Sequence, residues 1–259
     1  NDTILDVSEL TVKVQMLPLI KKQVEIDGIR IEGVSVNTAG LIDGMRLKGE
    51  LGELFLNSHG VELTPETAIL NSFSLKDARL ALTLADTASV DTTEASEPLR
   101  WKIRLEDIRL DNVSFFLQMP LDTMDVGLEI GKASLRDGFV DLHKELYRAS
   151  EFSLLKSKVT YNSGSRPQAE NGFDPSHVGL TDINVSLDSI YYAGNNIRAL
   201  IRQFELKERS GLQIVSTEGE LRADNEAIHV PSLRMNTANS FVEFNAMADW
   251  SVTEQSGQG

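Results

Sequence analysis

The apolar residues of this chain alternate in pairs, and successive pairs step forward five residues at a time. Two-residue alternation is typical of a β-strand with one dry face and one wet face. On a straight strand, the extra residue between two pairs would turn the next pair to the wrong face. We therefore predict strands that absorb the extra residue in a β-bulge or a bend. The clearest series are Val24, Ile26, Ile29, Ile31, Val34 and Val36; Ile103, Leu105, Ile108, Leu110, Val113, Phe115 and Leu117; Leu128, Ile130, Ala133, Leu135, Gly138, Val140 and Leu142; and Val178, Leu180, Ile183, Val185, Leu187, Ile190 and Tyr192.

This spacing predicts an all-β protein, built as an elongated, curved and mostly antiparallel sheet with one or two short helices. Helical periodicity is scarce, and no helix long enough to connect parallel strands is visible. Repeated units that bury their apolar faces only against neighbours indicate a groove-like or solenoid-like body. Short helical segments are expected over residues 18–22 and 143–150, and a turn over residues 57–60, where the sequence is Asn-Ser-His-Gly.

We expect one continuous β-groove fragment over residues 1–259. Two polar segments, 86–98 and 162–176, are poor in large apolar residues and are interpreted as loops. Because the same spacing resumes after each loop, both loops are expected to leave and rejoin one sheet. They would join three sub-blocks, which are residues 1–85, 99–161 and 177–250. Both ends of the chain are interpreted as cut from a longer protein.

The composition excludes several classes of partner. With 41% apolar residues, the chain can build a sizeable core, and a formal net charge of −14 argues against nucleic acid as a partner. The same charge argues against docking on an anionic membrane through a polybasic patch. The chain has no cysteine, so it forms no disulfide, and no apolar run approaches the roughly 20 residues of a membrane helix.

The polar residues do not form a recognisable catalytic or metal-binding motif. The four histidines, His59, His143, His177 and His229, are widely separated, which disfavours a zinc site. In the first loop, Asp86, Asp91 and Glu94 match no calcium-binding spacing and are interpreted as a solvated acidic linker.

A second group of acidic residues stands at the steps between apolar pairs: Asp107, Asp111, Asp182 and Asp188. Aspartate tolerates unusual backbone angles, so turns and bulges are favoured there over acid–base catalysis. Neither a Gly-x-Ser-x-Gly elbow nor a phosphate-binding glycine-rich loop is present. The sequence predicts no enzyme activity, no metal and no cofactor.

The apolar stripe itself is the remaining candidate site. Sheets must be covered, and the helices expected here are too few to cover this one. Either the sheet curls over itself into a filled core, or the apolar face lines a groove that holds an apolar ligand. The candidate groove or core residues are Val24, Ile26, Ile29, Ile31, Ile103, Leu105, Ile108, Leu110, Val113, Phe115, Leu128, Ile130, Leu135, Ile183, Val185 and Leu187.

Several segments resemble a known family. Residues 17–37 (LPLIKKQVEIDGIRIEGVSVN) are similar to the opening of AsmA-like proteins, where a turn containing proline precedes alternating strands. Residues 52–63 (GELFLNSHGVEL), 98–102 (PLRWK), 131–146 (GKASLRDGFVDLHKEL) and 180–211 (LTDINVSLDSIYYAGNNIRALIRQFELKERSG) resemble the amino-terminal half of TamB-like translocation and assembly module proteins of Bacteroides-type bacteria. The shared patterns are strands and turns, so they specify architecture better than activity.

The resemblance implies a periplasmic segment of a protein anchored in the inner membrane by one amino-terminal helix, which is absent here. It implies a long curved sheet with a hydrophobic concave face, and a role in outer-membrane protein assembly together with an outer-membrane partner of the Omp85 type. It also implies passage of phospholipid, or of other acyl-chain cargo, between the membranes. The alternative is a structural or interaction module in the cell envelope, which acts as a spacer or docks partners by strand addition, without a lipid groove.

Overall fold

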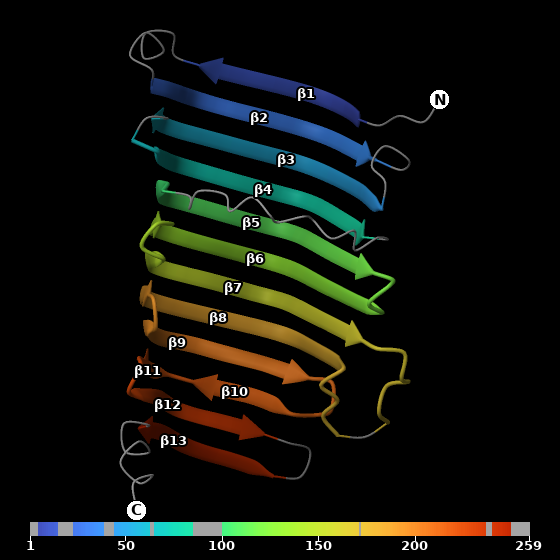
Figure 1. Cartoon of the computed structure of the whole chain (residues 1–259), viewed down its shortest axis with the longest axis vertical. Coiled ribbons are helices and arrows are strands. Elements are labelled where there is room, and N and C mark those ends of the chain that lie inside the picture. Colours follow the sequence, from blue (N-terminus) through green and yellow to red (C-terminus); the bar gives the residue numbers. More distant parts are fainter. Residues whose placement is uncertain are drawn as a thin grey trace, which may run out of the picture.

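The protein was analysed as a computed structural model, which describes residues 5–14, 23–38, 44–62, 65–84, 100–170, 172–236 and 240–249. The statements below concern these residues. They form one 13-stranded sheet and contain no helix (Figure 1). The strands are β1 (Leu5–Val14), β2 (Gln23–Asn37), β3 (Met45–Glu62), β4 (Thr67–Leu84), β5 (Lys102–Met119), β6 (Met124–Asp141), β7 (Leu146–Ser163), β8 (His177–Ala193), β9 (Asn196–Glu208), β10 (Gln213–Thr217), β11 (Gly219–Ala223), β12 (Ala227–Asn236) and β13 (Phe241–Asp249).

Nearly all neighbouring strands are antiparallel, which confirms the predicted fold class. The strands follow chain order from β1 to β9, and the same sheet runs through all three predicted sub-blocks. Both β10 and β11 lie between β9 and β12, so the two short strands share one place in the sheet. β4 and β5 are the exception because they pair in parallel. The sequence did not predict this pair, since its pattern shows no helix long enough to connect parallel strands.

The extra residue in the apolar spacing is absorbed by β-bulges that are aligned from strand to strand. At each bulge one residue has no cross-strand partner. The residue opposite it on the neighbouring strand is also left out of the register, so the pairing on both sides of the bulge stays aligned. Asp77 and Asn112 illustrate the pattern: both have positive φ, 51° and 53°, and the Asn112 amide donates a 2.6 Å hydrogen bond to the Asp77 carboxylate. We call this bulge row 1, which contains Ser8, Gly33, Gly52, Asp77, Asn112, Gly131 and Lys156.

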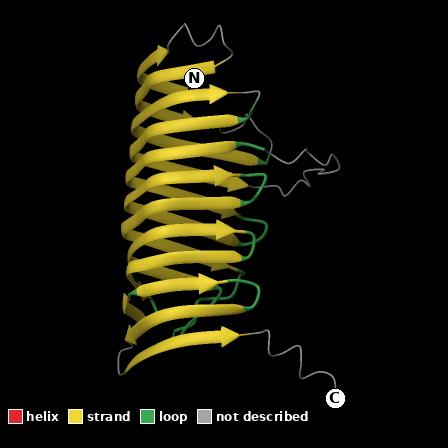
Figure 2. Cartoon of the chain, turned by 90° about the vertical axis from the view of Figure 1, so that its left-hand side faces the viewer, coloured by secondary structure: helices red, strands yellow, loops and turns green. Residues whose placement is uncertain are grey.

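A second set of aligned bulges crosses β4 to β8. Bulge row 2 contains Asn71, Glu106, Asp137, Ser150 and Ser189, which are likewise skipped by the cross-strand register. Asp137 and Ser189 have positive φ, and the Asn71 amide donates to the Glu106 carboxylate over 2.8 Å. Bulges bend strands and increase their twist. All long strands bend in the same direction, so the sheet curls into a trough (Figure 2).

The apolar stripe faces the inside of this curl. The positive-φ bulge residues, such as Asp77, Asn112 and Asp137, are solvent-exposed, as expected on the outer side of a bend. On the opposite face, the residues at the bend are closely packed: a Cβ on Gly138 would come within 2.6 Å of Leu135 and 3.1 Å of Leu105. We call the face that carries the stripe the inner face, and the other the outer face.

Two local predictions are wrong. Residues 57–60 lie inside β3, where register shifts against β2 and β4 accommodate the irregular sequence without ending the strand. Residues 143–150 form no helix: a turn ends at Glu145 and β7 begins at Leu146, because hairpin pairing with β6 outweighs local helix propensity. The predicted helix at 18–22 and the loop at 86–98 lie outside the described residues. The loop predicted at 162–176 lies between β7 and β8, and β7 extends into it as far as Ser163.

Candidate functional site

The inner face carries the predicted apolar residues in register from strand to strand. Phe73 of β4, Ile108 of β5 and Leu135 of β6 are direct cross-strand neighbours, and Leu80, Phe115 and Leu128 form a parallel row nearer the end of the strands. Such neighbours pack against one another along the sheet. The stripe is therefore a continuous apolar surface and not a set of isolated strand residues.

Most of the sixteen candidate residues are only half-buried. Ile183 and Val185 are buried, at 6% and 9% exposure. Val24 and Ile26 lie in β2, but their side chains are outside the described part of the structure. The half-buried candidates are Ile29, Ile31, Ile103, Leu105, Ile108, Leu110, Val113, Phe115, Leu128, Ile130, Leu135 and Leu187.

No second layer covers this surface among the described residues. Every strand contacts only the strands with which it pairs. Within the same part of the chain only five hydrophobic side chains are buried, which are Ala149, Ile183, Val185, Ala199 and Ile201. Single-layer burial leaves a large apolar area accessible along the trough, and contiguous exposed apolar surface of this kind marks a binding site or a site of aggregation.

The amino-terminal part of the trough contains a distinct hollow. It has a volume of about 310 Å³ and lies against β2 to β5 beside bulge row 1. Gly49 lies in its wall and lets Val36 and Leu80 approach closely, since a Cβ there would lie 3.0 and 3.2 Å from them. The apolar side chains around it are Val34, Val36, Leu51, Leu75, Ala78, Leu80, Val113 and Phe115. Their surface is almost entirely apolar, so the hollow can hold hydrocarbon and offers little to orient a polar group.

Sequence reasoning named only two residues of this hollow, Val113 and Phe115, as candidate site residues. Those from β3 and β4 were missed because Gly49 and Gly52 interrupt the pattern in β3. A usable signal exists in β4, where Phe73, Leu75, Ala78 and Leu80 repeat the five-residue step around Asp77.

The histidines and aspartates singled out in the sequence lie in structural contacts or in exposed positions. The Nδ1 of His229 lies 3.2 Å from the carbonyl oxygen of Glu220, while His59 and His143 are exposed. Asp107 and Asp188 bind Arg109 and Arg202, each at 2.6 Å. Asp182 has a φ of 51°, as predicted for a bulge. At two other predicted steps, Asp111 and Asp188, the next residue adopts the positive φ instead.

One tightly bonded group lies in the loop before β8. The Asp174 carboxylate accepts hydrogen bonds from the Ala169 and Ser176 amides, both at 3.0 Å, and lies 2.9 Å from the His177 Nδ1. The Ala169 amide, together with His177 and Ser176, lowers the pKa of Asp174 to about 2, although partial burial opposes the shift. This group closes the loop, and no third metal-ligating side chain joins it in the described structure.

The described chain also offers no group of three or more histidine, aspartate or glutamate side chains that could bind a metal ion. Asp86, Asp91 and Glu94 lie outside it. No helix capable of crossing a bilayer was found in the same residues. Comparison of the chain with protein-family models finds no match, and none of the curated proteins matches it with significance. The site must therefore be interpreted from its own geometry.

Proposed function

We propose that this chain is a periplasmic segment of an inner-membrane-anchored envelope biogenesis protein. Its apolar trough would carry phospholipid between membranes, assist outer-membrane protein assembly, or do both. The observation that carries the proposal is the continuous apolar inner face, which has no covering layer among the described residues. The family resemblance of the sequence supports the same function. It also supplies the proposed Omp85-type partner, which would be engaged through other regions of the protein.

The energetics of a hydrocarbon ligand fit a surface of this kind. Burial of one methylene from water gains about 0.8 kcal/mol, so full burial of an ordinary acyl chain gains on the order of 10 kcal/mol. A shared apolar surface along many strands allows the ligand to move without a step that breaks polar contacts. The exterior, with a net charge of −14 for the chain, favours solubility while the inner face is occupied.

The proposal is tested by native mass spectrometry of the purified chain after incubation with phosphatidylglycerol or phosphatidylethanolamine. We expect adducts with the mass of one or more phospholipids. The variant Ile108→Asp places a charge at the centre of the stripe, between Phe73 and Leu135. It should remain folded and lose at least nine-tenths of the bound lipid.

Ser134→Asp is the matched control because it adds the same charge to the outer face of β6, opposite Arg109. It should bind lipid like the unaltered chain. A lipid-free protein, or equal loss in both variants, would count against the trough. Unfolding of Ile108→Asp alone would indicate that the stripe is a self-filled core.

An interaction module remains the second candidate function, and the edge strand β1 favours it. β1 ends the sheet, and its inner-face residues Leu10 and Val12 are 61% and 50% exposed. A partner strand added to this edge would satisfy its backbone groups and cover both side chains. Cross-linking from Thr11 in the full-length protein would detect that partner, whereas cross-links confined to lipid would exclude this role.

A further inference from the structure

A row of arginine and aromatic residues crosses the outer face of the sheet. The cross-strand register aligns one such residue from each of six strands, β5 to β9 and β11. We call this the arginine row; in order it contains Arg104, Phe139, Arg148, Tyr191, Arg198 and Arg222. Its chain neighbours, such as Ile103 and Val140, belong to the apolar stripe, so the row faces away from the trough.

The arginines of this row are exposed and mostly lack acidic partners. Arg222 binds Glu220 at 2.5 Å. Arg148 lies over the Phe139 ring, 4.8 Å from its centroid, and neither it nor Arg104 or Arg198 forms an ion pair with a described residue. Arginines elsewhere on the sheet, including Arg136 and Arg202, do bind carboxylates. In a chain with 39 acidic residues, three aligned guanidinium groups that form no salt bridge are a concentrated positive feature. Of the three, Arg198 also interacts electrostatically with Glu220 and Asp224.

Acidic residues lie beside the two ends of the row. Glu106 and Asp137 lie next to Arg104 and Phe139 in bulge row 2, and Asp224 lies next to Arg222. On the other side of Phe139, Asp141 is buried and pairs across the strands with Lys102. Same-face residues along a strand are separated by about 7 Å, so the positive strip is only one side chain wide. A flat anionic membrane or a polyphosphate backbone would meet these carboxylates as well as the arginines. The charge pattern therefore favours a linear ligand with separated negative charges.

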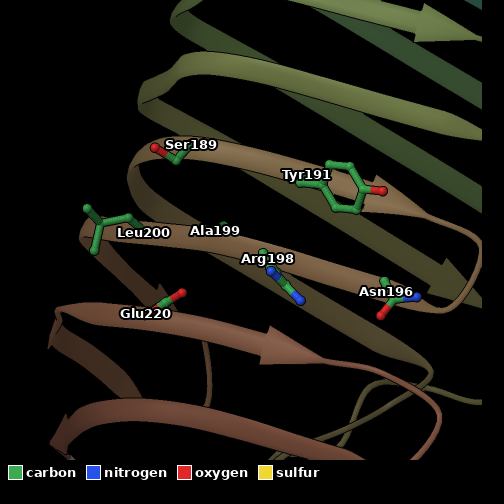
Figure 3. A pocket seen from close by; sticks show the side chains of 7 residues that line it. All are labelled: Ser189, Tyr191, Asn196, Arg198, Ala199, Leu200 and Glu220. Carbon is green, nitrogen blue, oxygen red and sulfur yellow. The ribbon is translucent and has the colours of Figure 1, made fainter.

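A hollow of about 710 Å³ lies beside the β8–β11 part of the row. Tyr191 of β8 and Arg198 of β9 line it, together with Asn196, Leu200 and Glu220 (Figure 3). Figure 3 shows Tyr191, Asn196 and Arg198 along the neighbouring strands β8 and β9, with Glu220 of β11 beside them. The hollow offers a guanidinium, an amide and a phenol hydroxyl to a ligand side chain, with a planar ring beside them, while its Glu220 carboxylate is bound by Arg222. These groups suit a carboxylate-bearing side chain with an apolar neighbour.

We propose that the arginine row docks an extended acidic segment of a partner protein. Carboxylates of the segment bind Arg148, which lies over the Phe139 ring, and Arg198, and a neutral residue between them lies over Tyr191. The two arginines are two strands apart, a separation of about 10 Å. An extended polyproline II segment advances about 9.3 Å in three residues, so an acidic residue at every third position matches this spacing. The interaction uses the outer face and does not depend on lipid in the trough.

The test uses the whole chain and a fluorescein-labelled peptide of Glu-Pro-Pro repeats, with a Lys-Pro-Pro peptide of equal length as a probe control. We expect the acidic peptide to bind in an anisotropy titration, with an affinity that falls as salt is added. The double variant Arg148→Glu and Arg198→Glu should weaken binding at least tenfold. The Lys-Pro-Pro peptide should not bind.

The matched control is Lys76→Glu with Lys132→Glu, which makes the same charge change at exposed outer-face positions of β4 and β6. It should weaken binding less than twofold. Should the double glutamate variant fail to fold, Arg148→Gln with Arg198→Gln provides the same comparison without charge reversal. Absence of peptide binding to the unaltered chain, or equal weakening in the row and control variants, would overturn the proposal.

Two further probes separate the partner classes. Inorganic polyphosphate and phosphatidylcholine vesicles containing phosphatidylglycerol should bind more weakly than the acidic peptide. Tighter binding of either probe, lost in the arginine-row variants, would reassign the row to a phosphate ligand and overturn the peptide assignment.

Discussion

The inner faces of β2–β5 and β7–β9 carry similar apolar spacing but bury it to different extents. All five buried hydrophobic side chains of the described structure lie in β7, β8 and β9. Leu80 in β4 remains 38% exposed, and the 310 Å³ hollow lies beside it. Toward one end of β7–β9, Tyr147, Tyr192 and Ile197 are exposed to a similar extent, so the buried part of that region is its middle. The difference teaches that the spacing determines which face is apolar, whereas side-chain size near the bulges determines whether that face is filled.

In the filled region, large apolar side chains face one another directly across the strands. Val185 pairs with Phe204 and Leu154, and Phe152 pairs with Leu187. Ala149 and Ala199 allow the strands to bend closely, and both are buried. In β2–β5, by contrast, none of the described apolar side chains is buried, and the 310 Å³ hollow remains beside them. We therefore expect β7–β9 to supply rigidity, and β2–β5 to supply room for a ligand.

The largest expected effect compares the same substitution in the two regions. Ile183→Ala removes a buried side chain of β8 and should lower the free energy of unfolding by about 3 kcal/mol. Ile108→Ala removes a half-buried one and should cost about 1 kcal/mol, because part of its surface already contacts water. Urea unfolding followed by circular dichroism measures both. Equal costs would show that the two regions are packed alike.

The second prediction concerns the close approach of strands at bulge row 1. A Cβ on Gly131 would lie 2.7 Å from the Lys156 carbonyl oxygen, so Gly131→Ala should cost about 2 kcal/mol of unfolding free energy. Gly179→Ala is the control because its nearest neighbour would be 3.5 Å away, an ordinary contact. A thermal melt should separate the two variants by several degrees. If they melt together, the bulge relaxes without strain.

The third prediction fills the amino-terminal hollow. Ala78→Phe places a ring in the hollow, and, given the proposed function, should weaken binding of a fluorescent fatty acid about fivefold. Ala133→Phe makes the same change on the inner face of β6, away from the residues that line the hollow, and should have less effect. Fluorescence titration compares them. A stronger effect of the β6 variant would place the ligand outside the hollow, farther along the trough.

The smallest expected effect is local to the loop that precedes β8. The pKa of Asp174 is lowered from 3.8 to about 2, so the stabilising contribution of its carboxylate is present above pH 4 and is lost as pH falls towards 2. The amide resonances of Ala169 and Ser176 should shift with that midpoint in an NMR titration.

Asp174→Asn should abolish this titration, and Asp122→Asn, in an exposed turn, should leave it unchanged. A midpoint near the ordinary value of about 4 would show that the loop hydrogen bonds do not stabilise the charged form.

Sequence reasoning identified the sheet and its apolar face because both follow from the order of residues within single strands. Ile103 to Phe115 alternate around Asn112 in a way that only a bulged strand satisfies. The arginine row could not be predicted from such a pattern. Arg104, Arg148 and Arg198 become neighbours only through the register of separate strand pairs. The parallel pairing of β4 with β5 was missed for a related reason: it depends on which strands meet, not on either strand alone.

The two aligned bulge rows separate the width of the trough from its length. The interval from one row to the other is the same between Asn71 and Asp77, Glu106 and Asn112, Gly131 and Asp137, and Ser150 and Lys156. Each strand thus encodes the cross-section by itself, and the number of strands sets how far the trough extends. Duplication or loss of a hairpin would lengthen or shorten the molecule while leaving the width of the trough unchanged.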